Sequence, residues 1–132
     1  LHFETRTFPA EFCNMRQDIT QLGADEHVCY YACRYECEEP MELALRLGYD
    51  GPVKMWHDKG EVFSDPEGTN PAMPNDAIVR LSSAAGTHEL MVALGTQRGC
   101  AWGIFLRLER IDVPHRLVKL GPQHYKMPKI LG

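Results

Sequence analysis

The sequence predicts an all-β fold, an antiparallel β-sandwich of about eight strands. Short segments in which apolar and polar residues alternate are separated by turns rich in Gly, Pro, Asn and Asp. The chain shows no βαβ pattern and no convincing long helix. The clearest stretch is 45–65, LRLGYDGPVKMWHDKGEVFSD, in which two tight turns separate three alternating segments.

Length and charge limit the class of protein. With 132 residues we expect one domain, 1–132, that buries roughly two-thirds of its unfolded surface. The net charge of -4 and the lack of a Lys/Arg cluster argue against a nucleic-acid partner. No apolar run approaches the length of a membrane span, so we expect no membrane partner.

The N-terminal region, 1–23, has mixed signals. FETRTF (3–8) has the composition of a strand, whereas residues 10–23 carry apolar side chains at approximate helical spacing. This second segment predicts either a short helix or an irregular edge strand.

The first clear strand is predicted over 27–37, and it contains three of the cysteines. Of five cysteines, Cys29, Cys33 and Cys37 lie four residues apart on one face of this strand. At the usual rise, neighbours are about 13 Å apart, too far for a disulfide or a shared metal. We therefore expect buried free thiols, which mildly favour a reducing compartment.

Alternation predicts six further strands, and the core of the sandwich is expected over 27–110. In the last of them, Trp102, Ile104, Leu106 and Leu108 are predicted to share one face. Beyond Asp112 the periodicity is lost, which predicts a C-terminal surface tail over 111–132. The six strands are predicted at 41–47, 53–57, 61–63, 77–81, 88–94 and 102–108.

Antiparallel connections place the varied loops at one end of the sandwich. If the chain reverses direction at each turn, loops 24–26, 48–52, 64–76 and 95–99 meet at the same end. The opposite end then carries only short turns. Loop 64–76 contains three prolines and one glycine, and a loop of this length tends to be functional or disordered.

The loop end carries the candidate binding residues. Amides, carboxylates and a guanidinium make directional hydrogen bonds to hydroxyl-rich ligands, and an aromatic ring adds an apolar face. The alternative is that the Asp and Asn residues form turns, the tryptophan is core, and the arginine pairs with a loop carboxylate. The candidates are Tyr49, Asp50, Asn70, Gln97, Arg98 and Trp102.

Other chemistries have weaker support. Asp65 and Glu67 are weak candidates for a structural calcium, because the segment lacks the spacing of a recognised calcium loop. His57 and His88 fall at core-facing positions and are predicted to be packed rather than catalytic. No serine lies in a nucleophile elbow, so we expect no enzyme activity and no cofactor.

Three segments carry a resemblance to a known family. GYDGPVKMWHDKGEVF (48–63) resembles the DDG-V-K-V-W-x-NG-K-x-V signature of galactose-binding-like jelly-roll domains. AAGTHELMVAL (84–94) and GCAWGIFLRLE (99–109) resemble later strands of that family. These domains occur as carbohydrate-binding modules and as accessory β-sandwiches appended to glycoside hydrolases. The chain departs from the family at Tyr49, where an Asp is usual, and at residues 57–60, which predict a longer turn.

The resemblance implies a non-catalytic carbohydrate-binding module that recognises a glycan through the loop end. The alternative is a structural or interaction domain of the same fold with no ligand of its own. In either case the implied partner is a catalytic domain of a parent protein. A typical module of this kind is extracellular, whereas the free cysteines mildly favour a reducing compartment.

Overall fold

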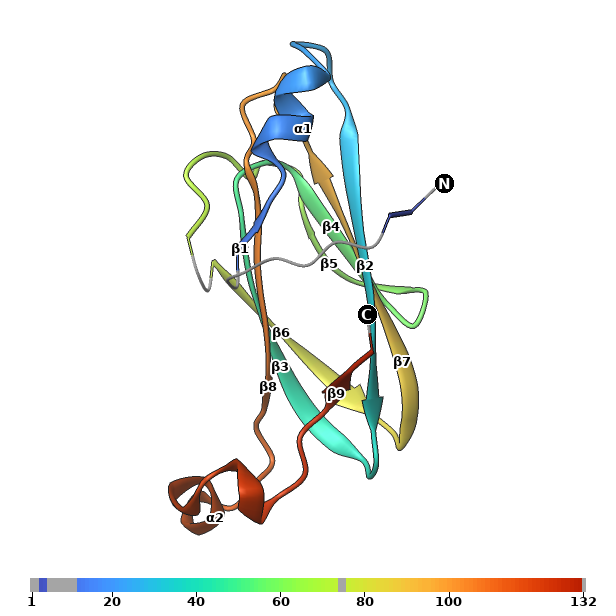
Figure 1. Cartoon of the computed structure of the whole chain (residues 1–132), viewed down its shortest axis with the longest axis vertical. Helices are drawn as coiled ribbons and strands as arrows, with labels where there is room; N and C mark the ends of the chain where they lie inside the picture. The colour runs from blue at the N-terminus through green and yellow to red at the C-terminus, as the bar shows by residue number, and fades with distance from the viewer. Residues whose placement is uncertain (1–2, 5–11, 74–75, 132) are drawn as a thin grey trace.

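Two antiparallel sheets packed face to face make up most of the structure (Figure 1). The computed structural model describes residues 3–4, 12–73 and 76–131. The β-sandwich predicted from the sequence is confirmed. No helix in this described part of the chain is long and apolar enough to span a membrane.

The first sheet has four strands, in the order β1-β8-β3-β6. Its long central strand β3 pairs with β8 on one side and β6 on the other, so β3 is buried along most of its length. The strands are β1 (Phe12–Asn14), β3 (Met41–Tyr49), β6 (Ala77–Ser83) and β8 (Gly103–Arg110).

The second sheet has five strands, in the order β5-β4-β7-β2-β9. Strand β7 lies at its centre and pairs over ten residues with β2 and over five with β4. The strands are β2 (Val28–Cys37), β4 (Val53–His57), β5 (Gly60–Asp65), β7 (Gly86–Gly95) and β9 (Lys129–Ile130).

The N-terminal segment combines both of the alternatives predicted for it. The short edge strand β1 is followed at once by helix α1 (Arg16–Gln21), whose Ile19 is fully buried. The strand predicted at FETRTF falls mainly on residues 5–11, outside the described residues.

The last long strand begins one residue later than predicted. Trp102 precedes β8 and is 48% exposed, so the prediction that it shares a strand face with the buried Ile104 was wrong. The reason is a competing partner, because the Trp102 amide donates to the Asp50 carboxylate at 2.7 Å instead of joining a strand ladder. From Ile104, which is fully buried, the alternation follows the prediction.

The turn between β4 and β5 is shorter than predicted. His57 pairs with Gly60, so only Asp58 and Lys59 form the turn, both with positive φ (48° and 72°). Two residues with positive φ match the geometry of a type I′ hairpin. The prediction of a longer turn at 57–60 was therefore wrong.

The core lies between the sheets and is built from the inward side chains of the long strands. Met55, Leu94 and Tyr35 from the five-stranded sheet face Leu47 and Leu45 from the four-stranded sheet within one cluster of buried residues. All five cysteines are free thiols, as predicted. The predicted burial is complete only at Cys37, because Cys13, Cys29 and Cys33 are half-buried and Cys100 is exposed.

The C-terminal segment packs back onto the sandwich. It contains helix α2 (His115–Leu120) and a short 3-10 helix (Pro122–His124), and ends in β9, which pairs with Tyr35 and Glu36 of β2. Arg110 holds it in place by donating to Asp112 Oδ1 at 2.7 Å and to the Lys126 carbonyl at 2.9 Å.

Truncation of a buried side chain on the central strand β3 is expected to leave a cavity in the core. Leu47→Ala should lower the free energy of unfolding by about 2–5 kcal/mol, because Leu47 is fully buried. Ile78→Ala on neighbouring β6 is the control: its side chain is 55% exposed and should change stability by about 0.5 kcal/mol. Urea denaturation measures both, and equal losses would contradict the assignment of Leu47 to the core.

Candidate functional site

The loops predicted to meet at one end of the sandwich do meet there. Gln97 Nε2 donates to the Gly68 carbonyl at 3.0 Å, and Asn70 Nδ2 donates to the Cys100 carbonyl at 3.0 Å. These bonds join loop 64–76 to loop 95–99 and to Cys100, the residue that follows it. Both predicted binding amides therefore also serve to hold the loop end together.

Two of the predicted binding residues lie inside the protein. Asp50 is 2% exposed, and its carboxylate accepts the amides of Trp102 at 2.7 Å and Gly103 at 3.3 Å. Burial raises the pKa of Asp50, and the two amides act against that shift. Tyr49 is 8% exposed and donates its hydroxyl to Asp65 Oδ2 at 2.6 Å. Neither side chain presents its functional group to solvent.

The remaining candidates lie at the surface of the loop end. The Arg98 side chain is 81% exposed and lies 3.8 Å from the Glu26 carboxylate. The guanidinium of Arg16 lies 5.2 Å from the centre of the Trp102 ring, in a cation–π arrangement. At the weak calcium position, Asp65 Oδ1 accepts the amide of Glu67 at 3.0 Å.

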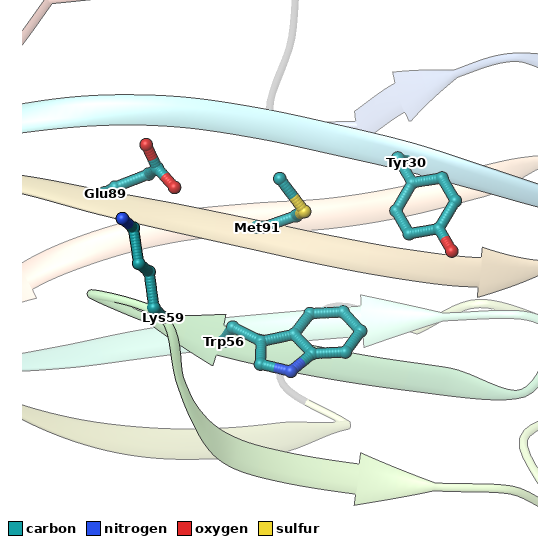
Figure 2. Close-up of a pocket in the computed structure, with 5 residues that line it drawn as sticks. All are labelled: Tyr30, Trp56, Lys59, Glu89 and Met91. Atoms are coloured by element: carbon teal, nitrogen blue, oxygen red, sulfur yellow. The ribbon is translucent and has the colours of Figure 1, made fainter. Parts of the chain in front are cut away.

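A different surface of the sandwich brings together two aromatic rings and two charged side chains. A groove of about 280 Å³ crosses the outer face of the five-stranded sheet (Figure 2). In Figure 2 Lys59 and Glu89 lie at one end, Tyr30 lies at the other, and Trp56 and Met91 lie between them. We call this surface the aromatic groove.

Strand register brings the groove residues together. Trp56 of β4 is paired with Met91 of β7, and Tyr30 of β2 is paired with Ala93 two residues further along β7. A register shift between Met55 and Trp56 interrupts the pairing of β4 with β5 at this point. The extra residue of this bulge is Val62 on β5, so Trp56 keeps the alternation of β4 and its regular pairing with β7.

Sequence reasoning missed the aromatic groove. The alternation in 27–37 already placed Tyr30 opposite to the inward cysteines, so its outward position was predictable. The strand order was not, and without β4 and β2 on either side of β7 nothing connects Tyr30 with Trp56. The missed residues are Tyr30, Trp56, Lys59, Glu89 and Met91.

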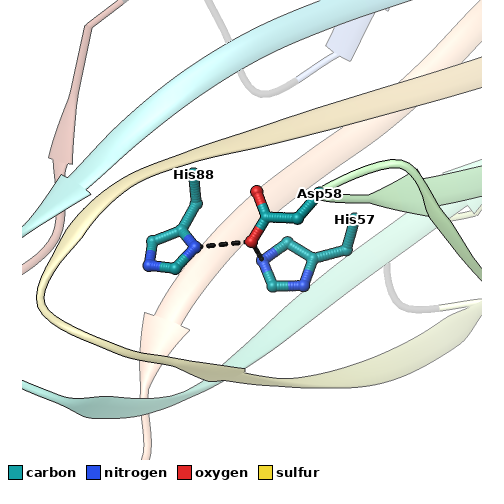
Figure 3. A group of neighbouring side chains, drawn as sticks. All are labelled: His57, Asp58 and His88. Atoms are coloured by element: carbon teal, nitrogen blue, oxygen red, sulfur yellow. Dashed lines mark hydrogen bonds and ion pairs between the residues drawn. The ribbon is translucent and has the colours of Figure 1, made fainter.

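A second cluster lies on the inner side of the same sheet region. His88 Nδ1 lies 2.6 Å and His57 Nε2 3.5 Å from the same Asp58 oxygen, Oδ2 (Figure 3). The other nitrogen of His88, Nε2, donates to the Ala84 carbonyl at 2.7 Å. Both histidine side chains are 11% exposed, which agrees with their predicted packing.

The three groups of this cluster shift one another's protonation. Burial would lower the pKa of His88, but its bonds to the Ala84 carbonyl and the Asp58 carboxylate outweigh burial and raise it. Burial lowers the pKa of His57. Burial would raise the pKa of Asp58, but the hydrogen bonds from His88 and the Glu89 amide lower it. The contact with Asp58 therefore favours the protonated form of His88 and the ionised form of Asp58.

The fold of this chain is similar to parts of two solved structures. The chain is similar to part of a β-glucosidase from Kluyveromyces marxianus, with a TM-score of 0.65 and 9% identity over 92% of this chain. It is also similar to part of the GH31 α-xylosidase from Xanthomonas citri, with a TM-score of 0.56 and 14% identity over 87% of this chain.

These likenesses concern a small part of each enzyme. The chain spans 16% of the length of the β-glucosidase and 13% of the length of the α-xylosidase. No protein-family model matches the sequence, and no curated protein matches it. At 9% and 14% identity, what is shared is a β-sandwich fold that occurs within larger glycoside hydrolase chains.

Removal of the Asp50 carboxylate is expected to destabilise the loop end. Asp50→Ala leaves the Trp102 and Gly103 amides without their acceptor and should lower the free energy of unfolding by about 2–4 kcal/mol. Glu67→Ala, at an exposed carboxylate of the same end, is the control and should have little effect. Urea denaturation measures both; an unchanged midpoint for Asp50→Ala would show that its carboxylate has no structural role.

Proposed function

We propose that this chain is a non-catalytic accessory β-sandwich of a larger glycan-active enzyme and that it binds carbohydrate in the aromatic groove. The observation that carries the proposal is the pair of rings, Tyr30 and Trp56, on one open sheet face beside charged side chains. Support also comes from the fold, which is similar to parts of two glycoside hydrolases.

The chemistry of the groove suits a sugar. One face of a pyranose ring presents C–H groups, which pack on an aromatic face, and its rim carries hydroxyls. Trp56 and Tyr30 supply the apolar surface, while Lys59 donates and Glu89 accepts hydrogen bonds. A volume of about 280 Å³ lies near the lower end of the range for small-ligand sites, which suits roughly one or two sugar units.

The loop end is the alternative position for the glycan. The galactose-binding-like resemblance favours this end, because in carbohydrate-binding modules of that type the sugar contacts commonly come from such loops. Arg98 and Trp102 are the surface groups there, with Asn70 and Gln97 beside them. We favour the groove because both loop-end amides already bridge loops, whereas the groove presents two rings and two charges on one face.

The second candidate function is a structural domain whose outer sheet face docks on a catalytic domain of the same parent protein. One observation favours it: Val28, 53% exposed, lies on the same face of β2 as Tyr30, which is 40% exposed, and extends the apolar surface. A docking face of this kind would bind no sugar.

A glycan-array screen of the isolated chain separates these functions. The wild type is expected to bind a defined set of glycans, and Trp56→Ala and Tyr30→Ala are each expected to weaken that binding at least about tenfold, or about 1.4 kcal/mol. Trp102→Ala and Arg98→Ala are matched controls at the loop end and should leave binding unchanged. Affinity for the best glycan is then measured by calorimetry.

Each other result has a definite meaning. Loss of binding only in the Trp102 and Arg98 variants would move the glycan site to the loop end. A blank array from a folded, monodisperse wild type would contradict carbohydrate binding for the sugars displayed and favour the docking function. Circular dichroism of every variant confirms that the fold is retained.

A further inference from the structure

We propose that His57, Asp58 and His88 form a binding site for a transition-metal dication of the zinc type. The three ligand atoms are His57 Nε2, Asp58 Oδ2 and His88 Nδ1, and all lie within 4.8 Å of one another. Figure 3 shows that each imidazole directs a nitrogen toward the carboxylate oxygen between them. The cluster is independent of the glycan site proposed above.

The donor set selects the class of metal. Two imidazole nitrogens and one carboxylate oxygen suit Zn²⁺, Ni²⁺, Cu²⁺ or Co²⁺, whereas Ca²⁺ and Mg²⁺ prefer sites made of oxygen alone. Three protein ligands leave a fourth tetrahedral position for an external ligand such as water. Asp58, whose side chain is 44% exposed, provides access to the cluster from solvent.

Two of the ligands are oriented by neighbouring groups. The His88 Nε2–H donates to the Ala84 carbonyl at 2.7 Å, which leaves Nδ1 as the ligating nitrogen. The Glu89 amide donates to Asp58 Oδ1 at 2.8 Å, which leaves Oδ2 directed at the histidines. Bonds of this kind, from a ligand's far atom to a backbone group, are typical of metal sites.

The third ligand has a partner that the metal can replace. Tyr35, fully buried, places its hydroxyl 2.7 Å from His57 Nε2 and 2.7 Å from Ser83 Oγ. When Nε2 binds a metal ion, the Tyr35 hydroxyl keeps Ser83 as its partner. Metal binding therefore leaves no buried hydroxyl without a hydrogen bond.

The geometry requires a small adjustment. Ligand atoms about 2.0–2.1 Å from a tetrahedral ion lie about 3.3 Å apart. The His57 Nε2 to Asp58 Oδ2 distance is already 3.5 Å, and the His88 Nδ1 to Oδ2 distance has to open from 2.6 Å by less than 1 Å. The two nitrogens, which lie within 4.8 Å of each other, have to approach by up to about 1.5 Å. Rotation of the Asp58 side chain in its two-residue turn opens the first contact, and small rotations of the two imidazole rings bring the nitrogens together.

The test titrates Zn²⁺ alone into the chain 1–132 by calorimetry, without any glycan. The wild type is expected to bind one Zn²⁺ per chain. His57→Ala, His88→Ala and Asp58→Asn are each expected to weaken binding more than about 100-fold, since even groups behind the ligands cost 10–100-fold. His124→Ala, at an exposed histidine outside the cluster, is the matched control and should bind as the wild type does.

A second readout separates this site from the cysteines. Co²⁺ bound by two histidines and a carboxylate gives visible absorption bands without the near-ultraviolet charge-transfer band of a thiolate ligand. A thiolate band, no binding by the folded wild type, or binding retained in His57→Ala would each overturn the proposal. If His88→Ala fails to fold, His57→Gln and Asp58→Asn carry the test, because both retain polar side chains of similar size.

Discussion

The pairing of β7 with both β4 and β2 is the constraint on which the rest of the molecule depends. Because side chains alternate along a strand, this register sends Trp56 and Met91 to the outer face and His57 and His88 to the inner face. A slip of one residue would exchange the two sets. The ten paired positions between β2 and β7 oppose such a slip. Tyr35, which lies opposite His88, is fully buried, and a slip would move it out of the core.

The loop end depends on a different interaction, the buried Asp50 carboxylate. The Asp50 carboxylate accepts the Trp102 and Gly103 amides. The Trp102 amide is therefore not available for strand pairing, so β8 begins at Gly103 and Trp102 lies outside the sheet. The same departure from the sheet brings Trp102 beneath the Arg16 guanidinium, which also donates to the carbonyl of Ala101 at 3.2 Å. One carboxylate thus joins the loop after β3, the start of β8 and the segment of α1.

Much of the fold follows from local pattern, because alternation and turn chemistry are properties of neighbouring residues. The inward face of 41–47 and the gathering of the loops at one end were predictable in this way. The role of Asp50 was not, since an Asp after a strand is equally suited to an exposed turn, and only the tertiary fold places two amides against it. Likewise, the convergence of His57 and His88 on Asp58 requires the pairing of strands about 30 residues apart in sequence, which no local pattern reports.

The aromatic groove and the histidine cluster are two faces of one short region. Trp56 precedes His57, Lys59 follows Asp58, and Glu89 follows His88, so three of the groove's residues are sequence neighbours of the three cluster residues. The Asp58 amide donates to the Glu89 carbonyl, and the Glu89 amide donates to Asp58 Oδ1. This reciprocal pair ties the β4–β5 turn to β7. The backbone that presents Asp58 and His88 to the inner side is therefore the same backbone that carries Lys59 and Glu89 on the outer side.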